Sequence, residues 1–423
     1  MRTADNGAAS GGARKRTALV IGCGVAGPVA AAALQKAGIE PVIYEAHPVA
    51  AEGVGAFLGV GLNGIDALRA VELDKPVLAR GFPLPRLVIF NGAGKLLADF
   101  PNGGTLPDGT GAITISRPDL YSALRDEVVA RGVRIEHGRR LVHAEETGGG
   151  VRAQFADGGT AEADLLVGAD GIHSAVRAVI DPTAPDARYV GFLNTAGYAR
   201  GIEVPGEPLV NYLVFGKRSF FGWLTAPDGV VWWFANPPRA DDPGPQRLAA
   251  ISSDEWRAQL LESFAGDASP AQALIRHTEH IIASVPTYDM PVVPNWHTER
   301  MVIIGDAAHA VSPSAGQGAS MSIEDAVTLG KCLRDVPEVA PALARYEVLR
   351  RDRVQRVVAQ GRSNDRGKTG GPVVRFFRDL FMPLATRRMF RDGRDPFRWI
   401  WSHHIDWDEP INQPAARSGN RPG

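Results

Sequence analysis

Long apolar stretches and net charge are both scarce in this sequence. It contains no run of about 18 apolar residues, the length that spans a bilayer, so we expect no membrane span. Its 423 residues carry a net charge of −1, which argues against nucleic acid as a bulk partner because such binding depends on excess positive charge. The segment MRTADNGAASGGARKR has no apolar core and does not predict a signal peptide.

Cysteine is scarce as well. Cys23 lies in a glycine-rich stretch and Cys332 in a predicted helix, so we expect no disulfide and a reducing, cytoplasmic location. His403-His404 has no acid or cysteine at a matching spacing, and we expect no metal site. Residues 1–15 and 412–423 are polar and are expected to be disordered tails. No pattern indicates the oligomeric state.

The clearest pattern present is a strand, a glycine turn and a helix near the N-terminus. The apolar run Leu19–Ile21 predicts a buried strand, and a G-x-G-x-x-G turn follows it at Gly22, Gly24 and Gly27. The first glycine permits a tight turn, the second lets the backbone approach a pyrophosphate, and the third lets the helix pack closely. This context predicts a dinucleotide-binding site.

An acid completes this unit. Glu45 ends the next predicted strand, about twenty residues after the glycines, where a carboxylate can accept both ribose hydroxyls of an adenosine. The same carboxylate would repel a 2′-phosphate. The site is therefore expected to hold FAD or NAD rather than NADP.

Two further clusters place acids at the ends of predicted strands. Residues 168–177 read GADGIHSAVR, with Asp170 after a buried strand. Residues 303–326 place Gly305-Asp306 after another strand and then run through Pro313 into a helix that begins near Gly316–Ala319. An acid at a strand end can hold a polyol hydroxyl, and open helix N-terminal N–H groups favour negative charge.

On these three blocks the sequence resembles the single-component FAD-dependent aromatic hydroxylases, the flavoprotein monooxygenases with the p-hydroxybenzoate hydroxylase fold. The resemblance covers residues 17 to about 360 and is closest to the salicylate hydroxylase branch. It implies FAD as cofactor and NADH or NADPH as co-substrate. It also implies that O2 adds to the reduced flavin as a C4a-hydroperoxide, which hydroxylates or epoxidises a small, aromatic or polycyclic substrate. No catalytic side chain is expected, because the flavin carries this chemistry.

The resemblance also implies roles for individual residues. Asp306 would bind the ribityl chain, Asp170 would serve the pyrophosphate region and the use of NAD(P)H, and Arg117 would contact FAD. Pro313 and Gly316–Gly318 would face the isoalloxazine. The expected FAD-binding set is Gly22, Gly24, Val25, Ala26, Gly27, Glu45, Arg117, Asp170, Gly305, Asp306, Pro313, Gly316, Gln317, Gly318 and Ala319.

The sequence departs from the family at two points and lacks a second nucleotide motif. After Gly318 it reads Ala-Ser-Met-Ser, where the family frequently has Met-Asn-x-Gly. No arginine occurs between Glu45 and Arg69, so flavin gating by an arginine in that stretch is in doubt. No second G-x-G-x-x-G is present, and NAD(P)H is expected to bind transiently.

The expected fold is α/β: a Rossmann-like FAD-binding domain with an inserted antiparallel-sheet substrate domain and a helical C-terminus. Aromatic strands between residues 181 and 284 predict the inserted sheet. Candidate pocket residues are Tyr212, Phe221, Trp223, Trp233, Pro313 and Ser314, although about half of the side chains of a strand must point away. The expected domains are residues 16–80, 112–182 and 286–335 for FAD, 81–111 and 183–285 for substrate, and 336–411 for the helical end.

Several interpretations stay open at this point. His309 is more compatible with a packed, hydrogen-bonded histidine than with a base. Between Arg345 and Arg398, 15 Arg and Lys residues against six acids indicate a solvated helical face, or attraction of NAD(P)H or an acidic surface. A flavin-dependent halogenase should carry a W-x-W-x-I-P segment, which this sequence lacks. An NAD-dependent dehydrogenase would explain residues 17–45 but not Asp170 and Asp306. A non-catalytic small-molecule binder is the third alternative.

Overall fold

The structure is a computed structural model that describes residues 14–48, 56–369, 371–390 and 395–411. The predicted tails therefore lie almost entirely outside the described residues, as does the glycine-rich segment 49–55. No helix in the described ranges is long and apolar enough to cross a membrane.

A five-stranded parallel sheet carries the N-terminal glycine turn. Its strand order is β18 (Met301–Ile303), β12 (Leu165–Gly168), β1 (Thr17–Ile21), β2 (Glu40–Glu45) and β8 (Arg134–His137). Every residue of β12 and β18 is buried, as a parallel sheet covered on both faces requires. The loops after β1, β12 and β18 therefore meet at one edge, where ligands of such sheets bind.

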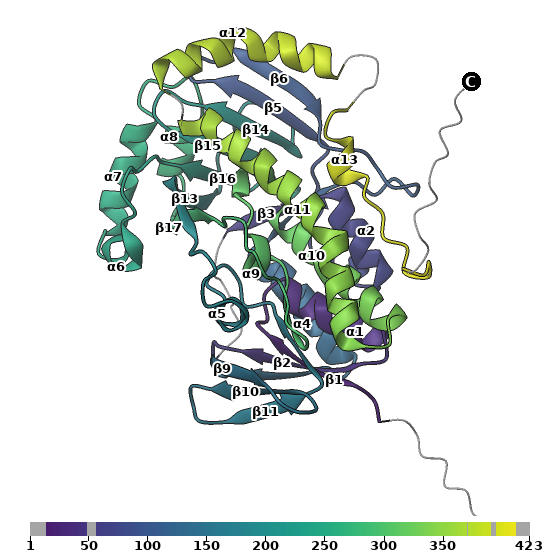
Figure 1. The fold of residues 1–423 in the computed structure, drawn as a ribbon. Helices are drawn as coiled ribbons and strands as arrows, with labels where there is room; N and C mark the ends of the chain where they lie inside the picture. Colours follow the sequence, from purple (N-terminus) through teal and green to yellow (C-terminus); the bar gives the residue numbers. More distant parts are fainter. Residues whose placement is uncertain (1–13, 49–55, 370, 391–394, 412–423) are drawn as a thin grey trace, which may run out of the picture.

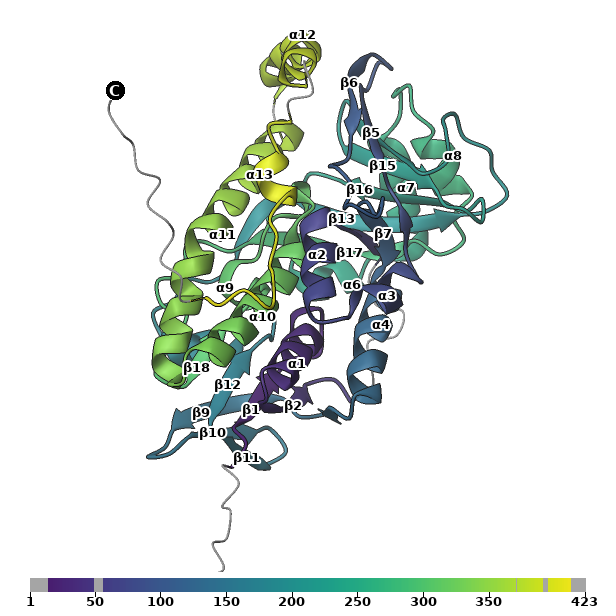
Figure 2. The same cartoon turned by 90° about the vertical axis from the view of Figure 1, so that its right-hand side faces the viewer.

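Helices from distant parts of the chain cover this sheet. Figure 2 shows α1 (Ala26–Lys36) beside α10 (Gly318–Asp335), with α11 (Val339–Thr369) packed outside α10. Gly330 permits the close contact, because a Cβ there would lie 2.6 Å from that of Ala33. The other helices around the sheet are α2 (Leu62–Ala70), α3 (Asp74–Leu78), α4 (Arg117–Ala130), α5 (Ala175–Ile180) and α9 (Asp306–His309).

The aromatic strands form a second, seven-stranded sheet above the first in Figure 1. Its order is β17 (Ile282–Asp289), β13 (Arg188–Ala199), β16 (Val231–Asn236), β15 (Phe220–Thr225), β14 (Val210–Phe215), β5 (Arg86–Asn91) and β6 (Leu96–Pro101). All pairs are antiparallel except β14 with β5. β17 crosses the expected domain boundary between residues 285 and 286. One face packs against α6 (Gly244–Ala249), α7 (Ser253–Ser263) and α8 (Ala271–Arg276).

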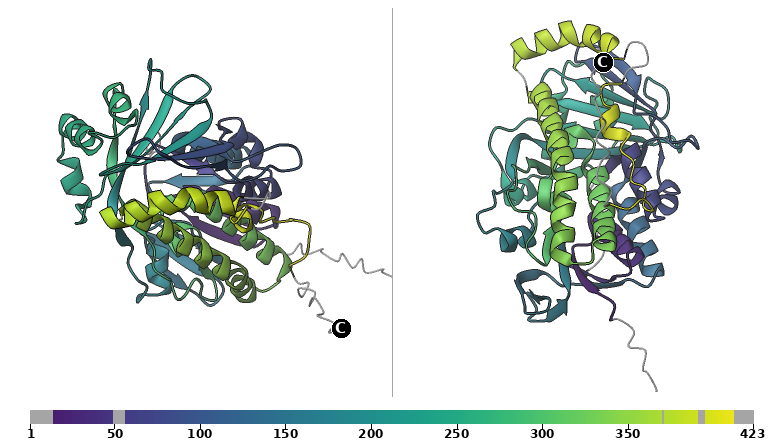
Figure 3. Two further views of the ribbon diagram at one scale, coloured as in Figure 1. Left: turned by 90° about the horizontal axis from the view of Figure 1, so that it is seen from above. Right: turned by 45° about the vertical axis from the view of Figure 1, so that its right-hand side comes forward.

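Smaller elements connect and extend these two layers. Two three-stranded sheets contain β9 (Leu141–Glu146), β10 (Val151–Phe155) and β11 (Thr160–Ala163), and β3 (Phe57–Val60), β7 (Ile113–Ser116) and β4 (Phe82–Pro83). The C-terminal helices α11, α12 (Pro372–Met389) and α13 (Arg398–Trp401) pass over both layers. In the right view of Figure 3, α12 lies at the upper end of the molecule.

Candidate functional site

The three glycines of the first turn differ in what surrounds them. Gly22 has a φ of +103°, and a Cβ there would lie 2.4 Å from the Ala169 carbonyl oxygen. A Cβ at Gly27 would lie 1.9 Å from the carbonyl oxygen of Gly22. A Cβ at Gly24 would meet no atom within 4 Å. Gly22 and Gly27 are thus required by the fold, while Gly24 borders open space that fits a phosphate group at the N-terminus of α1.

Glu45 lies directly beside this turn. Its carboxylate accepts the Cys23 backbone N–H at 2.8 Å and the His47 backbone N–H at 2.8 Å. This anchors the acid at the end of β2, the position from which it can reach ribose hydroxyls. Burial and the nearby Glu45 charge raise the pKa of the Cys23 thiol to about 12.

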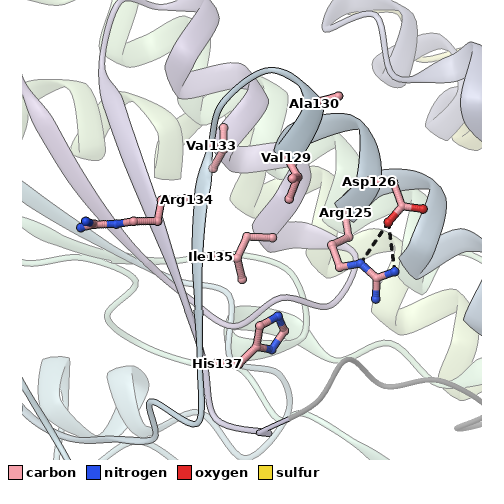
Figure 4. A pocket seen from close by; sticks show the side chains of 8 residues that line it. All are labelled: Arg125, Asp126, Val129, Ala130, Val133, Arg134, Ile135 and His137. Atoms are coloured by element: carbon pink, nitrogen blue, oxygen red, sulfur yellow. Dashed lines mark hydrogen bonds and ion pairs between the residues drawn. The ribbon is translucent and has the colours of Figure 1, made fainter.

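A pocket between α4 and β8 adjoins the Glu45 end of the turn (Figure 4). It is lined by Arg125, Asp126, Val129, Ala130, Val133, Arg134, Ile135 and His137. His137 pairs with Glu45 across β2 and β8, and Arg125 lies close enough to lower the pKa of Cys23. None of these residues was predicted from the sequence, because no motif marks them.

Asp306 lies at the same sheet edge. We refer to the open space at this edge, where a Cβ at Gly24 or at Gly318 would meet no atom within 4 Å, as the hollow. Asp306 begins α9 after Gly305, whose φ of +59° and 2.6 Å Cβ approach to the Ser322 hydroxyl admit only glycine.

The Asp306 side chain is exposed to solvent. The surrounding protein displaces much of the water around the carboxylate and raises its pKa, while the charges of His309 and Arg117 act to lower the pKa. No hydrogen bond from the described residues reaches its carboxylate, which leaves it open to a polyol hydroxyl. Arg117, exposed at the start of α4, lies near the same hollow.

A buried ionic network supports the loop that carries Asp306. Asp325 accepts the Gly305 backbone N–H at 2.9 Å and the Arg350 Nε at 2.7 Å, and it also contacts His309 Nε2. His309 is 3 % exposed, so it is the packed, hydrogen-bonded histidine that the sequence predicted. These buried contacts fix the conformation of the loop that begins at Gly305.

Four arginines of α11 form ion pairs of this kind. Their partners are Glu324 for Arg350 and Arg353, Glu347 for Arg351, and Asp289 for Arg362. These four side chains are part of the packed structure, whereas Arg387 and Arg388 of α12, in the same basic region, are exposed. His404 contacts Asp66 at 2.9 Å, and no metal-binding group of three or more His, Cys, Asp or Glu occurs within the described residues.

Asp170 is bound to the start of α5, and the role toward FAD and NAD(P)H that the resemblance implied for it stays a prediction. Its carboxylate accepts the Ser174 hydroxyl at 2.5 Å and the backbone N–H groups of Ala175 and Val176 at 2.8 and 3.1 Å. It therefore caps the N-terminus of α5. Arg177 on that helix donates to the Ala307 carbonyl oxygen at 2.9 Å, which ties α5 to α9. Asp170 is a positioning residue for the Asp306 loop.

The start of α10 lies beside this hollow. Gly316 has a φ of +62°, whereas Gly318 is helical, and a Cβ at Gly318 would meet nothing within 4 Å. The Asn63 side chain holds Gln317 by a 3.0 Å hydrogen bond to its Oε1. The first N–H groups of the helix, including those of Gly318 and Ala319, have no partner within the helix. This arrangement fits the electron-rich end of a flavin ring.

Four of the predicted pocket residues lie on the wrong face of the seven-stranded sheet. Tyr212, Phe221, Trp223 and Trp233 belong to the core packed against α7 and α8, and each is at most 9 % exposed. The alternation of the strands was expected, but the face that the helices cover was not known. Pro313 is exposed, and Ser314 is half-buried with a hydroxyl that has no partner within the described residues.

The opposite face of the sheet carries a half-buried aromatic cluster. Trp232 and Phe234 alternate with the buried residues of β16, and Tyr198 lies 5.2 Å from Trp232 between ring centroids. Phe57 of β3 closes the cluster at 5.3 Å from Trp232 and 6.1 Å from Phe234. We refer to Phe57, Tyr198, Trp232 and Phe234 as the aromatic face.

The end of α11 joins the aromatic face to the segment that contains Pro313 and Ser314. Asn364 donates to the Ser314 carbonyl oxygen at 2.9 Å. One turn later, Lys368 donates to Asn236 Oδ1 at 2.8 Å, and its ammonium lies 4.2 Å from the ring centroid of Phe220. Phe220 in turn contacts Phe234. Burial lowers the pKa of Lys368 to about 8, opposed by Asp365.

This fold and this hollow define a flavin-dependent oxidoreductase. A family model described as an FAD binding domain matches residues 15–361, and the chain belongs to this family. FAD-dependent urate hydroxylase of Klebsiella pneumoniae is 32% identical over 350 residues, 82% of this chain and 88% of that protein. The 3-amino-4-hydroxybenzoate 2-monooxygenase PtnB3 of Streptomyces platensis is 34% identical over 415 residues, 90% of this chain and 94% of that protein.

Comparison with solved structures also identifies FAD-binding proteins. Klebsiella pneumoniae HpxO complexed with FAD and uric acid has a TM-score of 0.77 and 28% identity, and the match covers 89% of this chain and 95% of that chain. The chain is thus an FAD-dependent monooxygenase that uses NAD(P)H as co-substrate. The halogenase, dehydrogenase and binder alternatives are set aside.

Proposed function

We propose that the enzyme hydroxylates a small, planar, anionic aromatic or heteroaromatic compound that binds against the aromatic face. The main observation behind this proposal is the alternation of burial along β16. Trp232 and Phe234 are half-buried, while their neighbours are packed into the core. Half-buried rings beside a flavin hollow can stack on a flat substrate. Bound FAD would supply the activation of O2, and the chain would bind, orient and exclude water.

The residues proposed to hold FAD are those that border open space. Gly24 would admit the pyrophosphate, Glu45 would accept ribose hydroxyls, and Asp306 would accept a hydroxyl of the ribityl chain. Arg117 would supply a cation near Asp306, and the N-terminus of α10 would approach the ring. Open space beside Gly24 and Gly318, and an Asp306 carboxylate with no hydrogen bond from the described residues, support the assignment.

Two polar groups at the aromatic face support an anionic substrate. Lys368 is a cation below pH about 8 and borders this face through Phe220. The Tyr198 hydroxyl, whose pKa burial and Asp119 raise to about 12, stays protonated and can donate a hydrogen bond. The names of the relatives, a urate hydroxylase and a 3-amino-4-hydroxybenzoate monooxygenase, are consistent with an acidic ring.

The test is substrate-stimulated NAD(P)H oxidation by the purified FAD enzyme. Aromatic acids and their neutral amides would be compared as matched pairs, with product masses checked for one added oxygen. We expect acids to stimulate oxidation and Lys368→Met to raise KM for the acids at least tenfold, with the amides unaffected. Lys75→Met, an exposed lysine of α3 far from the aromatic face, is the control. Equal rates with acids and amides would refute the anionic substrate, and no product with added oxygen would refute the hydroxylation.

A further inference from the structure

Helix α12 presents its apolar residues to solvent. Val373, Val374, Phe376, Phe377, Leu380, Phe381 and Leu384 are each between 50% and 69% exposed. They account for about two of every five residues of one 18-residue helix. Isolated exposed apolar residues are ordinary, but a contiguous set on one helix marks an interaction surface. We call these seven residues the apolar face of α12.

Asp379, Arg378 and Met382 of α12 contact the rest of the protein instead. Asp379 accepts the Asn91 side-chain amide at 2.8 Å, and the Lys95 ammonium donates to its carbonyl oxygen at 2.7 Å. The Arg378 guanidinium lies 4.2 Å from the Phe215 ring centroid. Met382 packs on the small core of β5 and β6. These contacts fix the rotation of the helix about its axis, so the apolar face has to point outward.

The charge around the apolar face is mainly positive. Arg387 and Arg388 are exposed at the end of α12, and neither forms an ion pair within the described residues. The sequence continues as RDGRD, with arginines at 391 and 394 and aspartates at 392 and 395. Asp379 is the one acid in α12, and it is turned toward Asn91. A second copy of α12 would therefore bring no acid from this helix to these arginines, whereas the phosphates of an anionic lipid surface would.

The position of α12 allows a flat surface to reach it. The helix lies at the outer end of the molecule, at the top in Figures 1 and 2. We propose that α12 attaches the enzyme to anionic phospholipid bilayers by lying in the membrane plane, with its apolar face in the acyl boundary and its terminal arginines among the phosphates. Helices with this distribution bind in plane rather than span. This inference does not rest on the proposed substrate.

The test is co-sedimentation of the full-length FAD enzyme with vesicles. We expect binding to phosphatidylglycerol–phosphatidylcholine vesicles and at least tenfold weaker binding to phosphatidylcholine alone. Phe377→Asp with Leu384→Asp should abolish binding to both, and Arg387→Glu with Arg388→Glu should remove the preference for anionic lipid. Val142→Asp, an equally exposed apolar residue on β9, is the matched control and should bind like the parent.

Two results would overturn the proposal. One is an enzyme that binds neither vesicle type. The other is a dimer in light scattering that Phe377→Asp with Leu384→Asp converts to a monomer, since the apolar face would then be covered by a second copy. The activity of every variant on a soluble substrate should equal that of the parent, because α12 contributes no residue to the hollow or the aromatic face. Equal activity also shows that the variants fold.

Discussion

Gly24 differs from its two neighbouring glycines because nothing in the chain occupies the space beside it. A side chain at Gly22 or Gly27 would collide with backbone carbonyl groups, so substitutions there test the fold. A side chain at Gly24 would enter the space assigned to the pyrophosphate. One motif therefore contains two structural positions and one binding position.

We predict that Gly24→Val folds but purifies without FAD. The valine would occupy the site of the pyrophosphate, and no backbone contact opposes it. Flavin absorbance and circular dichroism measure the two properties separately. Gly27→Val is the contrasting variant and should fail to fold; full flavin content in Gly24→Val would contradict the assignment of this turn.

Glu45→Ala should weaken FAD binding by about 1–3 kcal/mol, the usual loss for a charged hydrogen-bonding partner. Turnover at saturating FAD should be nearly unchanged, because the adenosine lies far from the reacting atoms. Titration of the apoenzyme with FAD measures the first effect, and steady-state kinetics measures the second. Lost turnover with intact FAD affinity would argue against an adenosine-binding role.

Lys368 should give substrate binding a pH dependence. Since burial places its pKa near 8, the ammonium is present below that pH and is lost as the pH rises through it. KM for an aromatic acid should therefore increase above pH 8, while KM for the neutral amide should not. Lys368→Met should abolish the difference. A parent enzyme whose KM for the acid stays flat from pH 7 to 9.5 would exclude this role.

At the scale of elements, the start of α10 depends on groups far away in the sequence. Asn63 holds Gln317, and Asp325 holds Gly305, so two helices and a loop position one ring-binding surface. Asn63 lies at the second position of α2, and its side chain is fully buried. The contact between Asn63 and Gln317 joins residues 254 positions apart, and no local pattern predicts it.

Gly318→Val should leave FAD bound but uncouple the reaction. The position is helical with open space beside it, so valine is tolerated by the fold and would push against the ring. We expect NAD(P)H oxidation to continue with hydrogen peroxide in place of hydroxylated product, since water would reach the reacting centre. The ratio of peroxide to product is the measurement. An unchanged ratio, rate and flavin content would show that α10 does not approach the ring.

The sequence allowed the strands of the second sheet to be predicted, but not its buried face. Alternation alone made Trp232 and Trp233 equivalent candidates. The packing of α7 and α8 places Trp233 in the core and leaves Trp232 half-buried. Asp170 is a similar case, because its place after a strand was evident, while its three hydrogen bonds to α5 depend on three-dimensional geometry. Local chemistry predicted the elements, and tertiary packing decided which side chains face the site.

At the scale of the whole molecule, one buried network joins the C-terminal helix to the N-terminal half. The Glu324 carboxylate accepts hydrogen bonds from Asn63 of α2 and from Arg350 and Arg353 of α11. Burial alone would raise the pKa of Glu324, but the two arginines outweigh it and lower the pKa to about 2. The pairs therefore link α2, α10 and α11 around the hollow.

This network predicts a loss of stability in acid. Glu324 has an ordinary pKa of 4.5 when unfolded, so its contribution is fully present above that pH and is lost as the pH falls from 4.5 toward 2. The melting temperature should therefore decrease steeply below pH 4.5. Arg353→Met should lower the melting temperature at neutral pH and make this decrease smaller, because losing one partner raises the folded-state pKa of Glu324 toward 4.5. Coincident profiles for the two proteins would show that the network does not control acid stability.

The surroundings of Cys23 have a further consequence for the lifetime of the enzyme. A monooxygenase of this type produces some hydrogen peroxide whenever turnover is uncoupled, and a thiol is oxidised through its thiolate. The environment that raises the pKa of Cys23 to about 12 keeps the thiol protonated at neutral pH. The cysteine of the glycine turn is therefore protected against the oxidant that its own enzyme releases, and sulfenic acid should form slowly there during prolonged turnover.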